Sequence, residues 1–85
     1  GDEAEAARLS ALGDVAWHAN NADQALQHYA AAWQQAPSPE LSLKIGEIFF
    51  QKQMLADAKK WWARYRRDTP SGPSLPYIDQ RLNGQ

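Results

Sequence analysis

Four residues of this 85-residue chain recur at one constant spacing. A glycine, an alanine, an aromatic residue and a proline are each followed, thirty-three residues later, by a residue of the same kind. The pairs are Gly13 and Gly46, Ala25 and Ala58, Tyr29 and Trp62, and Pro37 and Pro70. Self-similarity at a period of about 20 to 50 residues is typical of stacked repeat units. The chain is therefore expected to form a short solenoid, whose long surface favours recognition of other molecules over catalysis.

The spacing inside each unit predicts a pair of antiparallel helices. A glycine inside a helix costs about 1 kcal/mol relative to alanine, so a glycine at the same point of both units indicates the close approach of a second helix. The small alanine permits that approach, the aromatic ring fills the wider gap one turn later, and the proline ends the helix. The sequence therefore predicts helical hairpins at about 5–37 and 38–70 and a capping helix at about 74–83.

Start and stop signals place five helices in the chain. The expected ranges are about 2–19, 22–35, 39–52, 55–67 and 74–83, with a turn at 69–73. Asn21 is the expected N-cap of the second helix, with Gln24 three residues on. Ser38 is expected to cap the third helix, with Pro39 at its first position. Met54 gives the fourth helix a weaker cap.

The last expected helix continues the repeat and then stops. Ile78 and Leu82 correspond to Ile45 and Phe49, but Asp79 replaces the repeated glycine. Because no partner hairpin follows in the sequence, Asp79, Gln80 and Arg81 are expected to face water. Repeat arrays need such a polar end for solubility.

These residues resemble the tetratricopeptide repeat family. In the first unit the resemblance rests on Leu9, Leu12, Gly13, Ala25, Tyr29, Ala32 and Pro37, and in the second on Ile45, Gly46, Phe49, Ala58, Trp62 and Pro70. The chain departs from the family at Ser42, where a large residue is usual, and at Tyr65, where a small one is. The resemblance implies an all-α, right-handed α-hairpin solenoid of two repeats and a cap.

The resemblance also implies where a partner would bind. In this family the first helices of successive hairpins line a concave groove, and the family's groove positions fall on residues of both units and the cap. The residues expected to bind the partner are Asp14, Trp17, His18, Leu43, Lys44, Glu47, Phe50 and Tyr77. Trp17 and Phe50 hold equivalent positions one repeat apart, as a short peptide with an apolar anchor would require.

The sequence leaves two placements open for Trp17. Trp17 either faces the groove or tucks into the hairpin interface, where it would compensate for the small Ala16. A receptor for the carboxylate tails of cytosolic chaperones is disfavoured, because Asp14 would repel a carboxylate where those repeats use lysine and asparagine.

Charge divides the chain in two. Residues 1–43 carry a net charge of −5 and residues 44–85 a net charge of +4. The basic excess lies on the fourth expected helix, interleaved with Trp61, at Lys59, Lys60, Arg64, Arg66 and Arg67. Such a surface could meet nucleic acid, but a solvated outer helix face is the favoured reading, because nothing supplies a base-reading element.

No feature of the sequence favours catalysis. His18 and His28 fall on different expected helices, cysteine is absent, and no carboxylate pair forms an acid–base motif. No cofactor, metal or membrane insertion is expected, and a soluble chain is predicted, with the cytoplasm slightly favoured. The predicted function is a module that binds a protein or peptide segment within a larger protein; the alternative is a structural module that self-associates through its repeat faces.

Overall fold

The computed structural model describes residues 1–71 and 75–83, and within them every regular element is a helix. The five helices are α1 (Glu3–His18), α2 (Ala22–Gln35), α3 (Pro39–Gln51), α4 (Leu55–Asp68) and α5 (Leu75–Asn83). The predicted all-α class is confirmed, and each predicted boundary lies within one residue of the observed one. The predicted turn at 69–73 and the start of the fifth helix at 74 extend into residues that lie outside the described ones. No described helix is long and apolar enough to cross a membrane.

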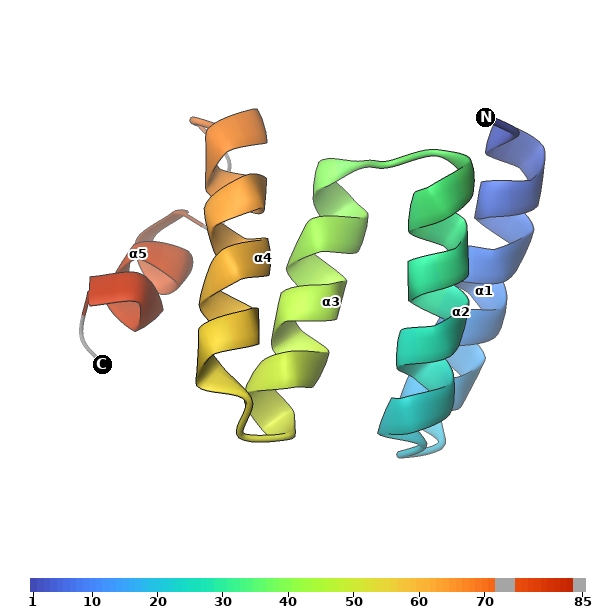
Figure 1. The fold of residues 1–85 in the computed structure, drawn as a ribbon, viewed down its shortest axis with the longest axis horizontal. Helices are drawn as coiled ribbons and strands as arrows, with labels where there is room; N and C mark the ends of the chain where they lie inside the picture. The colour runs from blue at the N-terminus through green and yellow to red at the C-terminus, as the bar shows by residue number, and fades with distance from the viewer. Residues whose placement is uncertain (72–74, 84–85) are drawn as a thin grey trace.

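The first four helices alternate in direction and form two hairpins (Figure 1). α1 packs on α2, and α3 packs on α4, while α2 joins the hairpins by packing on α3. α5 packs on the far side of α4. Each hairpin is therefore one copy of the sequence repeat, and the helices follow one another in space in chain order.

A glycine and an aromatic ring meet inside each hairpin. A Cβ atom on Gly13 would lie 2.5 Å from Cε1 of Tyr29, and one on Gly46 would lie 2.5 Å from Cδ1 of Trp62. Both rings are almost completely buried. The missing Cβ therefore lets each ring rest on the backbone of the first helix. A close approach at the glycine was predicted, but the alanine was expected to make it, whereas the nearest atoms belong to the aromatic ring.

The helix ends follow the predicted capping pattern. Asn21 accepts a hydrogen bond from the backbone N–H of Gln24, and Ser38 accepts one from that of Leu41. Met54 makes no side-chain cap, as expected. The hairpin turns also repeat, because Asn20 and Gln53, thirty-three residues apart, both adopt a φ of 62°. The same left-handed turn thus closes both hairpins.

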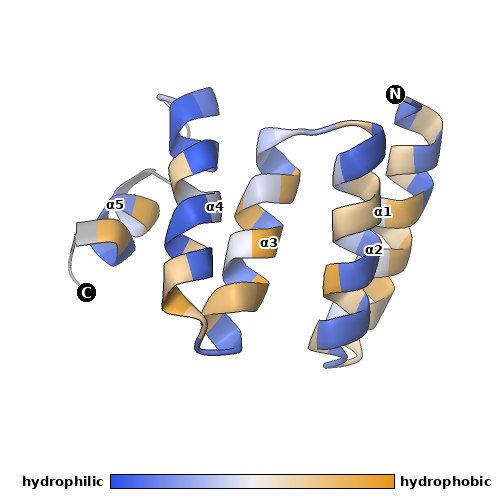
Figure 2. Ribbon diagram, viewed as in Figure 1, coloured by the Kyte–Doolittle hydropathy of each residue, from blue (hydrophilic) through white to orange (hydrophobic). Residues whose placement is uncertain are grey.

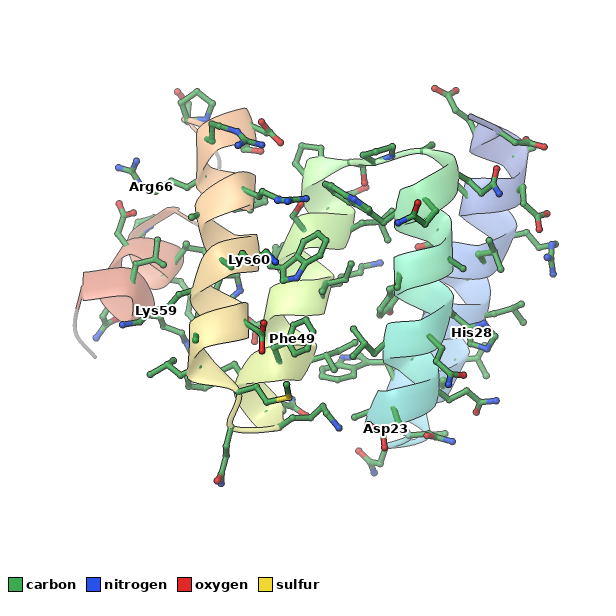
Figure 3. The ribbon with its side chains drawn as sticks, in the orientation of Figure 1. Asp23, His28, Phe49, Lys59, Lys60 and Arg66 are labelled. Atoms are coloured by element: carbon green, nitrogen blue, oxygen red, sulfur yellow. The ribbon has the colours of Figure 1, made fainter. Side chains whose placement is uncertain are left out.

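The core forms two clusters that meet at Phe49. One lies between α1, α2 and α3 and the other between α4 and α5, and Phe49, labelled in Figure 3, packs against both. The two departures from the family pattern are complementary in size, since Ser42 and Tyr65 are both buried where the first unit has Leu9 and Ala32. In the first unit the larger residue of the two is on the first helix, and in the second unit it is on the second helix.

Of the three polar residues expected to face water, Gln80 is exposed and Asp79 is partly exposed, but Arg81 lies on aromatic rings and that expectation is wrong for it. Asp79 forms an ion pair with Arg66 of α4. The guanidinium carbon of Arg81 lies 4.0 Å from the centre of the Phe50 ring and 4.2 Å from that of Tyr77. Together with Ile78, which is fully buried, these contacts fix α5 on the second hairpin. Arg81 follows Ile48, a core position, by thirty-three residues, so the repeat itself places its side chain inward.

Replacing Gly46 with leucine should destabilise the second hairpin by about 3 kcal/mol, because the new side chain would occupy the space of the buried Trp62 ring. Thermal unfolding followed by circular dichroism measures the loss. Ala63→Leu, at an exposed position of α4, is the matched control and should change the melting temperature little. Equal melting temperatures for the two variants would show that the helices do not meet at Gly46.

Candidate functional site

A groove runs between the first helices of the two hairpins. One part of it, with a volume of about 470 Å³, is bounded by residues of α1 and α3 and by Tyr29 of α2. Six of the eight predicted binding residues line this part: Asp14, Trp17, His18, Leu43, Lys44 and Glu47. We call it the first pocket.

The other two predicted residues lie in a second pocket between α3 and α5. Phe50 and Tyr77 line it together with Gln80 and Arg81, and its volume is about 330 Å³. Three pairs of lining residues are thirty-three positions apart: Trp17 and Phe50, Lys44 and Tyr77, and Glu47 and Gln80. The second pocket is therefore the first pocket repeated one unit further along the chain.

Asp14 ties three helices together at the centre of the groove. Its carboxylate accepts a hydrogen bond from the hydroxyl of Tyr29 and lies 3.1 Å from the ammonium nitrogen of Lys44. Partial burial acts to raise the pKa of Asp14, but the hydrogen bonds from Tyr29 and Lys44 outweigh it and hold the pKa below its ordinary value. Burial, followed by the bond to Asp14, raises the pKa of Tyr29. Asp14 is thus a carboxylate at neutral pH, and Tyr29 is a neutral donor.

His18 belongs to the same network. Its Nδ1 atom lies 2.7 Å from the backbone carbonyl oxygen of Asp14, so the tautomer protonated at Nδ1 donates a hydrogen bond there. The ring then presents its other nitrogen to solvent at the edge of the first pocket. His18 is therefore available as a hydrogen-bonding group to a bound molecule.

A further cavity of about 440 Å³ continues the groove toward the N-terminal ends of α1 and α3. Asp14 and Lys44 line this N-terminal cavity as well as the first pocket, so their ion pair stands between the two. Glu3 and Glu40 bring two more carboxylates to it, and Ser10 brings a hydroxyl group. This part of the groove is acidic, and its other lining residues include the apolar Ala6, Ala7 and Leu41.

The second pocket is more aromatic and holds one cation of its own. The ring centres of Phe50 and Trp62 are 5.4 Å apart, and those of Trp62 and Tyr77 are 6.3 Å apart. Burial, followed by a hydrogen bond to Glu47, raises the pKa of Tyr77 to about 12. The guanidinium of Arg81 lies over Phe50, so Phe50 is partly covered by the chain itself.

Both readings of Trp17 hold in part. Its half-buried side chain packs against the core beside Ala16, and it also lines the first pocket. The sequence analysis missed two contributors to the site. Tyr29 was assigned to packing alone, although its hydroxyl reaches Asp14, and Arg81 was placed in solvent. The hydroxyl that distinguishes Tyr29 from Trp62, and the core position that Arg81 shares with Ile48, were the available signals.

The basic residues of α4 lie outside the groove. Figure 3 shows Lys59, Lys60 and Arg66 projecting from α4, and hydrophilic residues cover much of its visible face in Figure 2. No residue of α4 lines the N-terminal cavity, the first pocket or the second pocket.

The aromatic residues among these charges are partly used in packing. The rings of Trp33 and Trp61 meet edge to face at 5.0 Å, and the guanidinium of Arg64 lies 4.8 Å from the centre of the Trp61 ring. These contacts join α2 to α4. Across residues 1–71 and 75–83, no three His, Asp or Glu side chains gather as metal ligands.

The chain is similar to part of a known protein kinase. No protein-family model matches the chain, and no solved structure matches it. A relative is the serine/threonine-protein kinase pkn3 of Myxococcus xanthus, which is 35% identical over 74 residues. The match covers 85% of this chain but only 14% of that kinase. The chain is therefore similar to a small part of a much longer protein.

The lowered pKa of Asp14 predicts an acid-sensitive contribution to stability. A carboxyl group whose pKa is lower in the folded state stabilises the fold above its ordinary pKa of 3.8, and this contribution is lost as pH falls through the lowered value. Asp14→Asn should therefore reduce the fall in melting temperature between about pH 4 and pH 2. Lys44→Gln should have the same effect in part. Identical acid profiles for the wild type and Asp14→Asn would contradict the network.

Proposed function

We propose that this chain is a tetratricopeptide-type module that binds a segment of another protein along the groove between α1, α3 and α5. The observation that carries the proposal is the repetition of the first pocket in the second at the spacing of the sequence repeat. A groove with the same aromatic position in successive units suits an extended segment, whose side chains also recur along its length. The right-handed solenoid of the family is part of this proposal.

Packing inside the hairpins supports the family assignment. The glycine and aromatic positions of the resemblance meet in each hairpin, and the alanine positions, Ala25 and Ala58, are fully buried. The tetratricopeptide pattern has small or aromatic residues at those positions so that the two helices of a hairpin can pack closely. At the two departures from the pattern, Ser42 and Tyr65, the side chains are also buried.

Similarity to part of a kinase is no reason to propose kinase activity for this chain. Protein kinases carry a glycine-rich loop, a His-Arg-Asp catalytic loop and an Asp-Phe-Gly motif. None of the three occurs in this sequence. The proposal therefore gives the chain a binding role, and such a module in a kinase would recruit substrates or regulators.

Phe50→Ala should weaken binding about thirtyfold, because truncating an anchor residue costs about 2 kcal/mol. The ligand is the tightest-binding peptide recovered from a displayed library of random twelve-residue peptides, and the affinity is measured by calorimetric titration. Lys59→Ala on α4 is the control and should change the affinity less than twofold.

Circular dichroism must show that Phe50→Ala is folded at the assay temperature, since Phe50 also packs on Trp62. Phe50→Leu, which keeps most of the bulk, should retain much of the binding. If Lys59→Ala abolished binding while Phe50→Ala left it unchanged, the binding surface would be α4 and the groove proposal would be wrong.

A second candidate function is self-association through α1. Ile45 and Ile48 of α3 are 1% and 0% exposed because α2 packs on that edge, whereas the equivalent Leu12 and Val15 of α1 are 39% and 69% exposed. The apolar edge that receives a neighbouring helix in the second unit is open in the first. The opposite end is already covered by α5, so association is expected between the α1 edges of two copies.

Val15→Lys should shift this association to the monomer, because a lysine would place a charge on the apolar contact. Sedimentation velocity over a hundredfold range of concentration measures it, and Ala63→Lys adds the same charge to an exposed position of α4 as the control. An association that vanished toward 1 M salt would instead indicate pairing of the acidic and basic halves of the chain. A wild-type monomer throughout would remove this candidate.

A further inference from the structure

The second pocket contains a cation seated on aromatic rings. Arg81 lies 4.0 Å from the centre of Phe50 and 4.2 Å from that of Tyr77, within the range at which a guanidinium is attracted to a ring face. The carboxyl group of Glu47 lies nearby, since it helps to raise the pKa of Tyr77. The protein thus shows what side chain this type of pocket accepts.

In the first pocket, the ring that corresponds to Phe50 has no cation over it. Trp17 takes the place of Phe50, and Ile48, which supplies no charge, takes the place of Arg81. Among the described residues, no Lys or Arg lies over the Trp17 ring. The pocket's own cation, Lys44, is paired with Asp14 and lies 5.5 Å from the centre of the Tyr29 ring. A cation on the Trp17 ring would therefore have to come from the bound partner.

The charges around the first pocket favour a positive partner. The groove from the N-terminal cavity through the first pocket is lined by four carboxylates and one ammonium group: Glu3, Asp14, Glu40, Glu47 and Lys44. Lys44 is paired with Asp14 at 3.1 Å, and Glu3, Glu40 and Glu47 form no ion pair with any described Lys or Arg. A basic segment would meet unpaired carboxylates, whereas an acidic one would be repelled.

We propose that the segment bound by the groove is basic and that one of its arginine side chains lies on Trp17, between Asp14 and Glu47. This inference rests on the proposed function and names its partner class. Arginine fits better than lysine, because its planar group can stack on the ring while its N–H groups donate to a carboxylate. Further Lys or Arg residues of the segment lie beside Glu3 and Glu40 in the N-terminal cavity.

The test uses the same displayed library of random twelve-residue peptides, selected against the full 85-residue chain. Arginine and lysine should be enriched in the peptides recovered, and replacing the critical arginine of the tightest-binding peptide by glutamine should weaken it at least tenfold. Trp17→Leu, which keeps an apolar side chain for the core, should weaken the same peptide about tenfold. Trp33→Leu, which alters an aromatic residue outside the groove, should weaken it less than twofold.

Charge removal separates specific binding from general attraction. The double variant Glu3→Gln, Glu40→Gln should weaken the peptide about fivefold and flatten its salt dependence. Asp57→Asn is the matched control, because Asp57 lies in the first turn of α4 as Glu40 does in α3. It should leave the affinity and the salt dependence unchanged.

The outcomes distinguish this inference from the proposed function. Peptides that need Phe50 but are neutral or acidic would leave the groove proposal standing and overturn the basic partner. If basic peptides bound Trp17→Leu as tightly as the wild type, the placement of an arginine on Trp17 would be wrong. If no recovered peptide depended on any groove residue, both the groove proposal and the basic partner would be wrong.

Discussion

An aromatic ring resting on a glycine sets the distance between the helices of both hairpins. In each hairpin a single methyl group on the glycine would lie within 2.6 Å of two ring atoms. The helix propensity that alanine would gain at this position, about 1 kcal/mol, is smaller than the cost of moving a buried ring. The groove depends on the same contact, since Asp14 and Glu47 each follow one of these glycines directly.

The two units use this contact differently. In the first, the ring belongs to Tyr29, whose hydroxyl crosses to Asp14 and so joins α2 to the groove. In the second, Trp62 cannot reach as far, and its buried Nε1 atom has no hydrogen-bond partner among the described residues. Glu47, the counterpart of Asp14, lies near Tyr77 of α5 instead and helps to raise the pKa of that tyrosine. The second pocket is consequently bounded on one side by α5, whereas the first contains the ion pair of Asp14 and Lys44.

The sequence predicted the elements well because its strongest signals are local. The caps at Asn21 and Ser38 depend only on neighbouring residues, and the thirty-three-residue spacing fixed which helices pair. All eight predicted binding residues line the two pockets, because they were taken from equivalent positions of the repeat. The tetratricopeptide assignment and the binding role of these residues remain predictions.

What the sequence missed came from contacts between distant residues. Arg81 was expected in solvent on account of its charge, yet three aromatic rings on different helices converge on its guanidinium. The pairing of Asp14 with Lys44 likewise depends on how α1 and α3 sit side by side, thirty residues apart in the chain. The charge of a residue predicts that it is solvated. Whether an aromatic ring or an opposite charge lies close enough to replace water depends on how the helices pack.

Repetition of a pocket has a consequence for selectivity that neither pocket would have alone. Under the proposed function, once one side chain of a bound segment occupied the first pocket, the binding of a second side chain of that segment would be an intramolecular event at a high effective concentration. Two individually weak sites on a rigid frame can then select a ligand by the separation of its side chains as much as by their chemistry. The helix spacing set by Gly13 and Gly46 would then determine which separation of side chains the two pockets accept.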